Sequence, residues 1–120
     1  MLDRDWMDPR NATMWQGVNG TNNPCPPGFR LPTKTELETE WLSWRTNNSA
    51  AAFASPLKLV VGGERDHSDG SLDRVGFQGH IWSSTDGVIG FWFLDFDGDF
   101  ADVWSNSGSA DGKSVRCIQD

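Results

Sequence analysis

The sequence predicts an α+β domain in which an amphipathic helix packs on a sheet built from the second half of the chain. Two stretches carry this prediction: a helix-start signal at residues 32–36 and an alternating, aromatic-rich pattern at residues 89–104. The 13 glycines and 6 prolines favour a loop-rich domain over a helical bundle. A chain of 120 residues is expected to form a single domain, residues 1–120.

The first helix is predicted from Lys34 to about Arg45. The Thr33 hydroxyl can cap this helix, and Glu36 can reach back to the Thr33 backbone N–H, which together make a capping box. Four apolar residues share one helical face: Leu37, Trp41, Leu42 and Trp44. We therefore expect this face to lie against the sheet.

Shorter elements are expected around this helix and the aromatic-rich stretch. Ser49 is expected to cap a second helix over residues 50–54, which Pro56 ends. Residues 62–79 have no hydrophobic period and are expected to form an irregular surface loop. Three further segments have the character of strands: residues 57–61, 80–84 and 113–119.

Residues 89–104 carry the strongest strand signal and predict a hairpin. Asp97 and Gly98 suit the centre of a two-residue turn, since both central residues of such a turn need positive φ. That turn pairs Leu94 with Ala101 and places Leu94 and Phe96 on one face. The other face then carries Phe91, Phe93, Asp95, Phe100, Asp102 and Trp104. Both faces are rich in apolar residues, whereas a one-sided hairpin alternates apolar and polar positions.

The segment GFRLPT at residues 28–33, followed by an acidic helix with Trp41, resembles a known motif. It is similar to the GYRLPTEAEWE motif of formylglycine-generating-enzyme-like proteins and their C-type-lectin-like relatives. The nearer resemblance is to the Fibrobacter succinogenes major paralogous domain, and it extends to residues 15–26, 53–59, 81–85 and 114–120. These blocks imply a C-type-lectin-like fold, with one or two helices packed on small twisted antiparallel sheets. The family's function is poorly defined, so the resemblance implies a fold more than a role.

Cys25 and Cys117 are too far apart in sequence for a CxxC metal or redox site. The residues alone allow either a structural disulfide or two unrelated buried thiols. The resemblance favours the disulfide, because it implies that Cys25 precedes the first helix and Cys117 lies in the last strand, which lectin-like folds bring together. A disulfide indicates an oxidising environment, so we expect an extracellular, cell-surface or virion-associated location. The polar, acidic residues 1–5 do not resemble a signal peptide, which favours a module of a larger exported protein.

The resemblance assigns Leu94 and Phe96 to the core face of the hairpin. The opposite face would then be exposed, and aromatic side chains interleaved with carboxylates are typical of protein-binding sites. We therefore predict a ligand-binding surface made of Phe91, Phe93, Asp95, Phe100, Asp102 and Trp104. The alternative is that another segment covers this face.

Some lectin-like domains are the variable ends of proteins diversified by diversity-generating retroelements. Their hypervariable residues occupy this hairpin and its loops, and their mutated asparagine codons cannot encode Trp, Lys, Glu, Gln or Met. Between residues 83 and 112 only Trp92 and Trp104 belong to that excluded set. The chain resembles such a variable protein in this region, apart from Trp104.

Neither a metal site nor catalysis is expected. The hairpin aspartates lack the downstream Glu of an EF-hand, and the calcium-binding tripeptides of sugar-binding lectins are missing. His67 and His80 lack metal-ligand spacing. Formylglycine-generating enzymes need reactive cysteines near the C-terminus, and Cys117 is assigned to the disulfide. We expect no cofactor and no enzymatic activity.

The net charge of −7, without a cluster of Lys and Arg, argues against nucleic acid as a partner. No apolar run is long enough for membrane insertion. We therefore expect a non-enzymatic domain that binds a protein or cell-surface ligand through the hairpin and its loops. The alternative function is a structural spacer or assembly module of a bacterial cell-surface or phage-tail protein.

Overall fold

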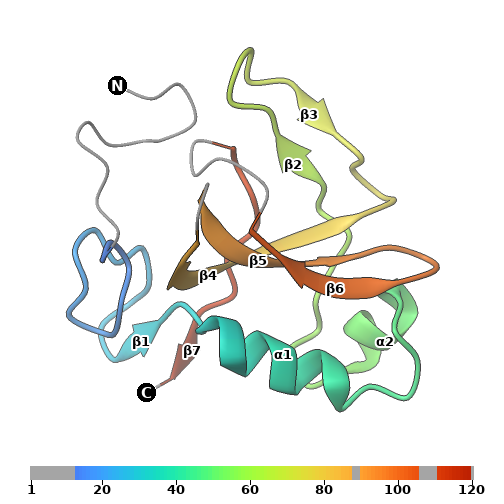
Figure 1. Ribbon diagram of the computed structural model, residues 1–120, viewed down its shortest axis with the longest axis horizontal. Coiled ribbons are helices and arrows are strands. Elements are labelled where there is room, and N and C mark those ends of the chain that lie inside the picture. The colour runs from blue at the N-terminus through green and yellow to red at the C-terminus, as the bar shows by residue number, and fades with distance from the viewer. Residues whose placement is uncertain (1–12, 88–89, 106–110, 120) are drawn as a thin grey trace.

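A computed structural model describes residues 13–87, 90–105 and 111–119 of the chain (Figure 1). The elements follow in the order β1 (Phe29–Arg30), α1 (Lys34–Leu42), α2 (Ser49–Ala54), β2 (Glu64–Arg65), β3 (Leu72–Asp73), β4 (Gly79–Asp86), β5 (Phe91–Phe96), β6 (Ala101–Trp104) and β7 (Ile118–Gln119). The largest antiparallel sheet has the order β4-β5-β6, while β1 pairs with β7 and β2 with β3. The predicted α+β class is confirmed.

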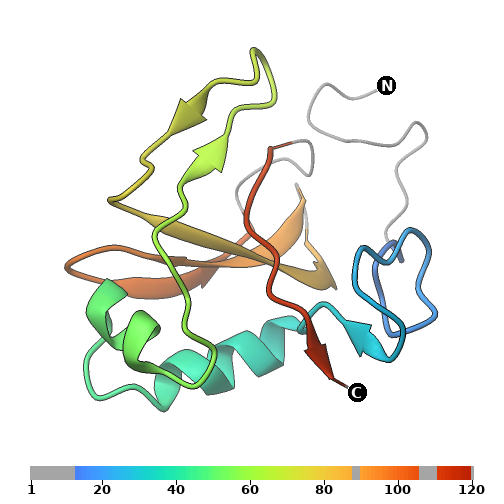
Figure 2. The same cartoon turned by 180° about the vertical axis from the view of Figure 1, so that it is seen from behind.

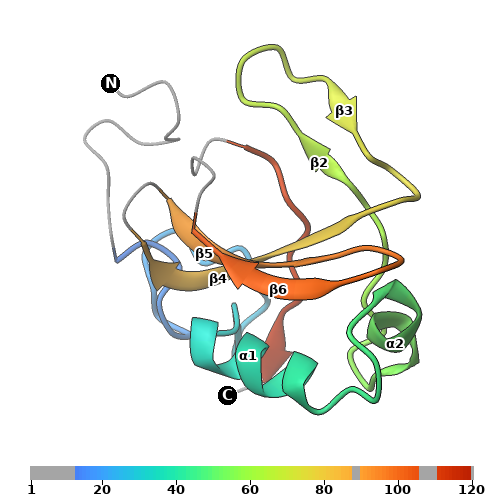
Figure 3. The same cartoon turned by 45° about the vertical axis from the view of Figure 1, so that its right-hand side comes forward.

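Helices α1 and α2 lie on one side of the three-stranded sheet, and β2 and β3 lie on the other (Figures 1 and 3). The core between helices and sheet consists of Leu37, Ala52, Leu59, Ile81, Leu94, Phe96, Ala101 and Val103. Burial of these apolar side chains is the main favourable contribution to folding. The prediction that Leu94 and Phe96 face the core is confirmed.

The predicted capping box at the start of α1 is confirmed. The Thr33 hydroxyl accepts from the Glu36 N–H at 3.2 Å, and the Glu36 carboxylate accepts from the Thr33 N–H at 2.8 Å. The Arg30 guanidinium donates to both Glu36 oxygens, at 2.7 and 2.9 Å. These bonds, that of Arg30 above all, lower the pKa of Glu36 to about 2. The ion pair therefore ties β1 to the first turn of α1.

Replacing Thr33 with Ala is expected to lower the free energy of unfolding by about 1 kcal/mol, because the Glu36 N–H loses its acceptor. Thr35→Ala is the matched control, since Thr35 is exposed within the helix itself. Urea unfolding of both variants measures the difference. Equal stability of the two variants would show that the cap contributes nothing.

The end of α1 differs from the prediction. The helix stops at Leu42 rather than near Arg45, and Leu42 is exposed instead of facing the sheet. The Ser43 hydroxyl donates to the Glu40 carbonyl, a local bond that competes with continuation of the helix. Trp41 and Trp44 still pack against the core.

The segment around α2 contains two corrections. The capping residue is Asn48, whose side chain accepts from the Ala51 N–H at 3.0 Å, and not Ser49. The strand predicted at residues 57–61 is wrong, because Lys58 has a φ of +53° and so interrupts an extended backbone. The Leu59 N–H instead donates to the Ala52 carbonyl and folds the segment back onto α2.

The β5–β6 hairpin forms with a different turn from the one predicted. Phe96 pairs with Ala101 and Leu94 with Val103, so the loop spans residues 97–100. The Asp97 carboxylate accepts from the N–H groups of Asp99 and Phe100, which favours this longer loop. The register shifts by two residues, and an even shift keeps the side chains of β5 and β6 on their predicted faces, whereas Asp99 and Phe100 lie in the loop.

The remaining strands agree only in part with the sequence. The segment predicted at residues 80–84 lies within β4, but the loop predicted at 62–79 contains the paired strands β2 and β3. Of residues 113–119, only Ile118–Gln119 is a strand, while Ser114 makes an isolated parallel bridge with Ile81. Residue 89, where the hairpin was expected to begin, lies outside the described residues.

Cys25 and Cys117 form a disulfide, as predicted, with their Cα atoms 5.8 Å apart. It lies beside the β1–β7 pair, and Figure 2 shows the C-terminal segment crossing in front of the sheet, in that view, to reach β7 next to β1. The bond thus joins the two ends of the described fold. Within the described part of the chain, no helix is long and apolar enough to span a membrane.

Candidate functional site

The sequence predicts a binding surface on the hairpin face opposite Leu94 and Phe96, which we call the outer face. The exposure expected there is wrong for Phe91, Phe93 and Asp95, which are all buried. Phe100 and Asp102 are half-buried. Trp104 is exposed as expected, at 40 %. The outer face is therefore mostly covered.

One half of the outer face is a second hydrophobic core. It consists of Met14, Trp15, Leu31, Trp82, Phe91 and Phe93. The Trp15 ring lies 5.0 Å from Phe91, and Trp82 contacts both phenylalanines edge-on at 5.8 to 6.4 Å. Such tilted and edge-on contacts are favourable arrangements of aromatic rings. The segment that precedes α1, at residues 13–31, thus supplies the cover for this half.

The other half of the outer face is a buried polar network. Lys113 Nζ lies 2.5 Å from Glu64 Oε2, and its side chain is only 1 % exposed. The same ammonium lies 4.3 Å from the centre of the Phe93 ring, within the range of a cation–π contact. The Gln78 amide donates to the Asp95 carboxylate at 2.6 Å. These contacts join β2, β5, Gln78 and Lys113.

The His80 side chain lies inside this network without a hydrogen bond. Its side chain is 5 % exposed, and its two nitrogens are 3.9 Å from Glu64 and Asp95 respectively. Among the described residues, neither ring nitrogen has a hydrogen-bond partner. Burial, assisted by the Lys113 charge, lowers the pKa of His80 to about 4, so the ring is neutral at pH 7.

Asp95 has the opposite perturbation. Burial raises the pKa of the Asp95 carboxyl, and the Gln78 hydrogen bond partly offsets that rise. Perturbed pKa values often mark catalytic sites, but structural networks also produce them. Since His80 and Lys113 are enclosed, a substrate would reach them only if the network opened. We therefore assign this network to stability.

Lowering the pH from 7 to 4 is expected to destabilise the protein through His80. The unfolded chain gains a proton on this histidine near pH 6.5, whereas the folded protein does so only near pH 4. Stability is thus lost as the pH falls through this window, by roughly 3 kcal/mol in all. Urea unfolding at several pH values measures the loss.

The matched variant is His80→Leu, which removes the titrating ring from this network. It should show a shallower loss of stability between pH 6.5 and 4 than the wild-type protein. The same slope in the wild-type protein and in His80→Leu would contradict the assignment.

Asp66, His67 and Asp111 form a cluster whose ligand atoms all lie within 4.8 Å of one another. Asp111 accepts from the His67 backbone N–H at 2.9 Å and lies 2.7 Å from His67 Nδ1. Asp66 accepts from the backbone N–H of Ser68 at 2.7 Å. These hydrogen bonds use atoms that a metal ion would need. We therefore interpret the cluster as a structural link that holds the β2–β3 loop to residue 111.

Three large apolar side chains are exposed within the segment that was expected to be a polar loop. We call Leu72, Val75 and Phe77 the apolar loop; Phe77 is 78 % exposed. The Phe77 N–H donates to the Arg74 carbonyl, and the Gly76 N–H donates to the Val61 carbonyl, so the turn is held on the body of the fold. Apolar residues in an otherwise polar loop were the signal that sequence reasoning overlooked.

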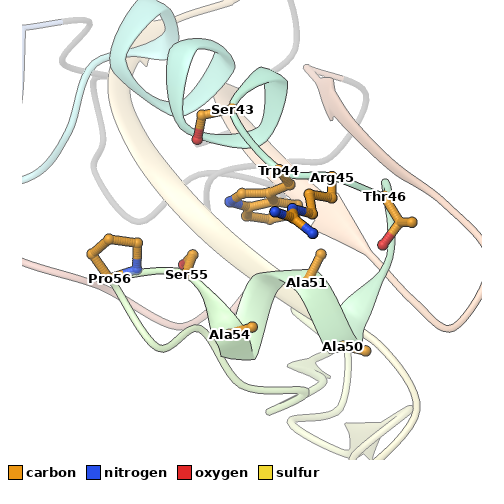
Figure 4. A pocket seen from close by; sticks show the side chains of 9 residues that line it. All are labelled: Ser43, Trp44, Arg45, Thr46, Ala50, Ala51, Ala54, Ser55 and Pro56. Atoms are coloured by element: carbon orange, nitrogen blue, oxygen red, sulfur yellow. The ribbon is translucent and has the colours of Figure 1, made fainter.

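A groove of about 430 Å³ opens between the end of α1 and α2 (Figure 4). Nine residues line it: Ser43, Trp44, Arg45, Thr46, Ala50, Ala51, Ala54, Ser55 and Pro56. None of the residues predicted as ligand-binding belongs to this groove. The sequence gives no periodic pattern at residues 43–56 that would have indicated it.

No family model, no curated protein and no solved structure matches this chain.

Proposed function

We propose that this chain is a non-enzymatic, C-type-lectin-like domain that binds a protein or cell-surface ligand through the apolar loop. The observation that carries the proposal is the exposure of three large apolar side chains, Leu72, Val75 and Phe77, within six residues of the chain. Exposed apolar side chains concentrated in one segment are typical of interaction surfaces. The resemblance in GFRLPT and the other blocks supports the lectin-like fold, together with the α+β architecture.

The surroundings of the apolar loop indicate the chemistry of the partner. Asp66, Asp69 and Asp73 lie in the same segment and are all exposed. The chain as a whole carries a net charge of −7. A partner with an apolar centre and a basic rim would therefore be complementary in polarity and charge.

The proposed setting is a module of a larger exported, cell-surface or virion-associated protein. The Cys25–Cys117 disulfide is compatible with such an oxidising environment. A diversified hairpin would have to vary at positions other than Phe91 and Phe93, because these side chains belong to the second core. Trp104, which is 40 % exposed, remains open to contact.

The proposal is tested by panning a random peptide library on the immobilised domain. Enriched peptides should combine apolar and basic residues, and their binding should weaken at least about tenfold in Val75→Ser and Phe77→Ser. Leu42→Ser is the matched control, because Leu42 is also a large, exposed apolar residue but lies on α1. If the enriched peptides bind all variants equally, the apolar loop is not the binding surface.

A second candidate is a structural spacer or assembly module. The burial of Phe93 favours it, because the predicted binding face then serves as core. In that case, any peptide that panning enriches should bind the Phe77→Ser variant as well as it binds the wild-type protein. The same experiment therefore separates the two functions.

A further inference from the structure

The groove between α1 and α2 has features of a small-molecule site that is independent of the apolar loop. Its volume of about 430 Å³ lies within the range of 300–1,000 Å³ that is typical of ligand pockets. Figure 4 shows Trp44 and Arg45 on one side, facing the alanines of α2. The turn after α1 and helix α2 thus provide opposing walls.

The alanines of α2 are the reason that the groove is hollow. Ala51 and Ala54 are three residues apart, so they share the helix face that lines the groove, and Ala50 adjoins them. Phe53, the large residue of this helix, lines a different hollow together with Val60. A longer side chain at Ala51 or Ala54 would fill the space.

Trp44 is held in place by contacts outside the groove. Its ring meets Phe96 edge-on at 6.2 Å, and its Nε1–H donates to Glu40 at 3.3 Å. The indole is therefore oriented before any ligand arrives, and a fixed flat surface binds without a large loss of side-chain entropy. A planar apolar group is the natural complement to such a surface.

The polar groups of the groove favour an anion over a sugar. The hydroxyls of Ser43, Thr46 and Ser55 already donate within the protein, to Glu40, Asn48 and Ala52 respectively. A sugar needs several free donors and acceptors. Arg45 is the one charged residue of the lining and has no ion pair among the described residues. Its guanidinium can donate two parallel bonds to a carboxylate.

We propose that this groove binds a small planar carboxylate. The apolar ring of the ligand lies between Trp44 and the alanines of α2, and its carboxylate pairs with Arg45. Recognition combines an apolar wall with one cation, in a chain whose overall charge is otherwise strongly negative. The site therefore requires both the ring and the charge of the ligand.

Isothermal titration with 2-naphthoate tests this site, and the neutral 2-naphthamide serves as its matched ligand. Saturable binding of 2-naphthoate below about 1 mM is expected, with binding of the amide at least about tenfold weaker. Arg45→Gln should weaken the binding of 2-naphthoate about tenfold or more, because a hydrogen bond between charged groups is lost. Lys58→Gln, which removes a cation outside the groove lining, should leave the affinity unchanged.

Filling the groove is the second arm of the test. Ala51→Leu and Ala54→Leu should each abolish binding, and thermal melts identify which of the two remains folded. The proposal is overturned if wild-type protein does not bind 2-naphthoate, or if Arg45→Gln and Lys58→Gln bind it equally. Equal affinity for the amide, or binding by a folded Leu variant, also overturns it. None of these outcomes depends on the apolar loop.

Discussion

Phe93→Ala and Leu94→Ala are expected to destabilise the protein by similarly large amounts, although the two side chains point to opposite faces of β5. Leu94 lies in the core beneath the helices, and Phe93 in the second core with Trp15 and Trp82. Truncation of a buried Phe typically lowers the free energy of unfolding by roughly 3–5 kcal/mol, and that of a buried Leu by roughly 2–5 kcal/mol. Urea unfolding of the two variants measures both losses.

Trp104→Ala is the matched control for Phe93→Ala. The two residues pair directly across β5 and β6, yet Phe93 is 3 % exposed and Trp104 is 40 % exposed. We expect the Trp104 variant to lose about 1 kcal/mol or less. If Phe93→Ala instead loses as little stability as Trp104→Ala, the outer face is exposed and not buried.

The start of α1 could be predicted because its causes are local. Thr33 and Glu36 are three residues apart, and the capping box needs only that spacing. The end of the helix depends on a weaker competition, in which Ser43 bonds to Glu40 instead of continuing the turn. The spacing of the tryptophans led us to predict a helix end near Arg45, three residues beyond the observed end at Leu42.

The hairpin shows how one signal can be right about faces and wrong about exposure. The predicted exposure of the outer face is wrong for Phe91, Phe93 and Asp95, and the alternative, that another segment covers this face, holds for them. Which segments cover the outer face depends on contacts between distant parts of the chain. Trp15 lies far before β5 in sequence, and Lys113 follows it after the whole of β6. No local periodicity records such contacts.

The groove could not be predicted for a related reason. Trp44 carries a helical-face signal, but its position opposite Ala51 depends on the turn between α1 and α2. The alanines of α2 indicate a helix by propensity and say nothing of what they face. The disulfide was anticipated through the resemblance, because the residues themselves allowed free thiols as well.

Removing the Cys25–Cys117 disulfide should be among the most damaging changes to this fold. The bond closes a loop of 92 residues, and chain-entropy treatment of such a loop gives roughly 4–5 kcal/mol of stability. The free energy of unfolding of a small domain is typically only about 5–15 kcal/mol. The double variant Cys25→Ala/Cys117→Ala is therefore expected to be partly unfolded near 37 °C, as urea and thermal unfolding would show.

Reductant provides the control for this prediction. It should destabilise the wild-type protein to the level of the double variant and leave the double variant itself unchanged. Hydrogen exchange distinguishes a global effect from local fraying of the β1–β7 pair, which has only two residues in each strand. If the Ile118 amide exchanges faster in the variant while the Leu94 amide keeps its protection, the disulfide stabilises only the ends of the chain. If both exchange faster by the same factor, the disulfide stabilises the whole domain, as the length of the closed loop predicts.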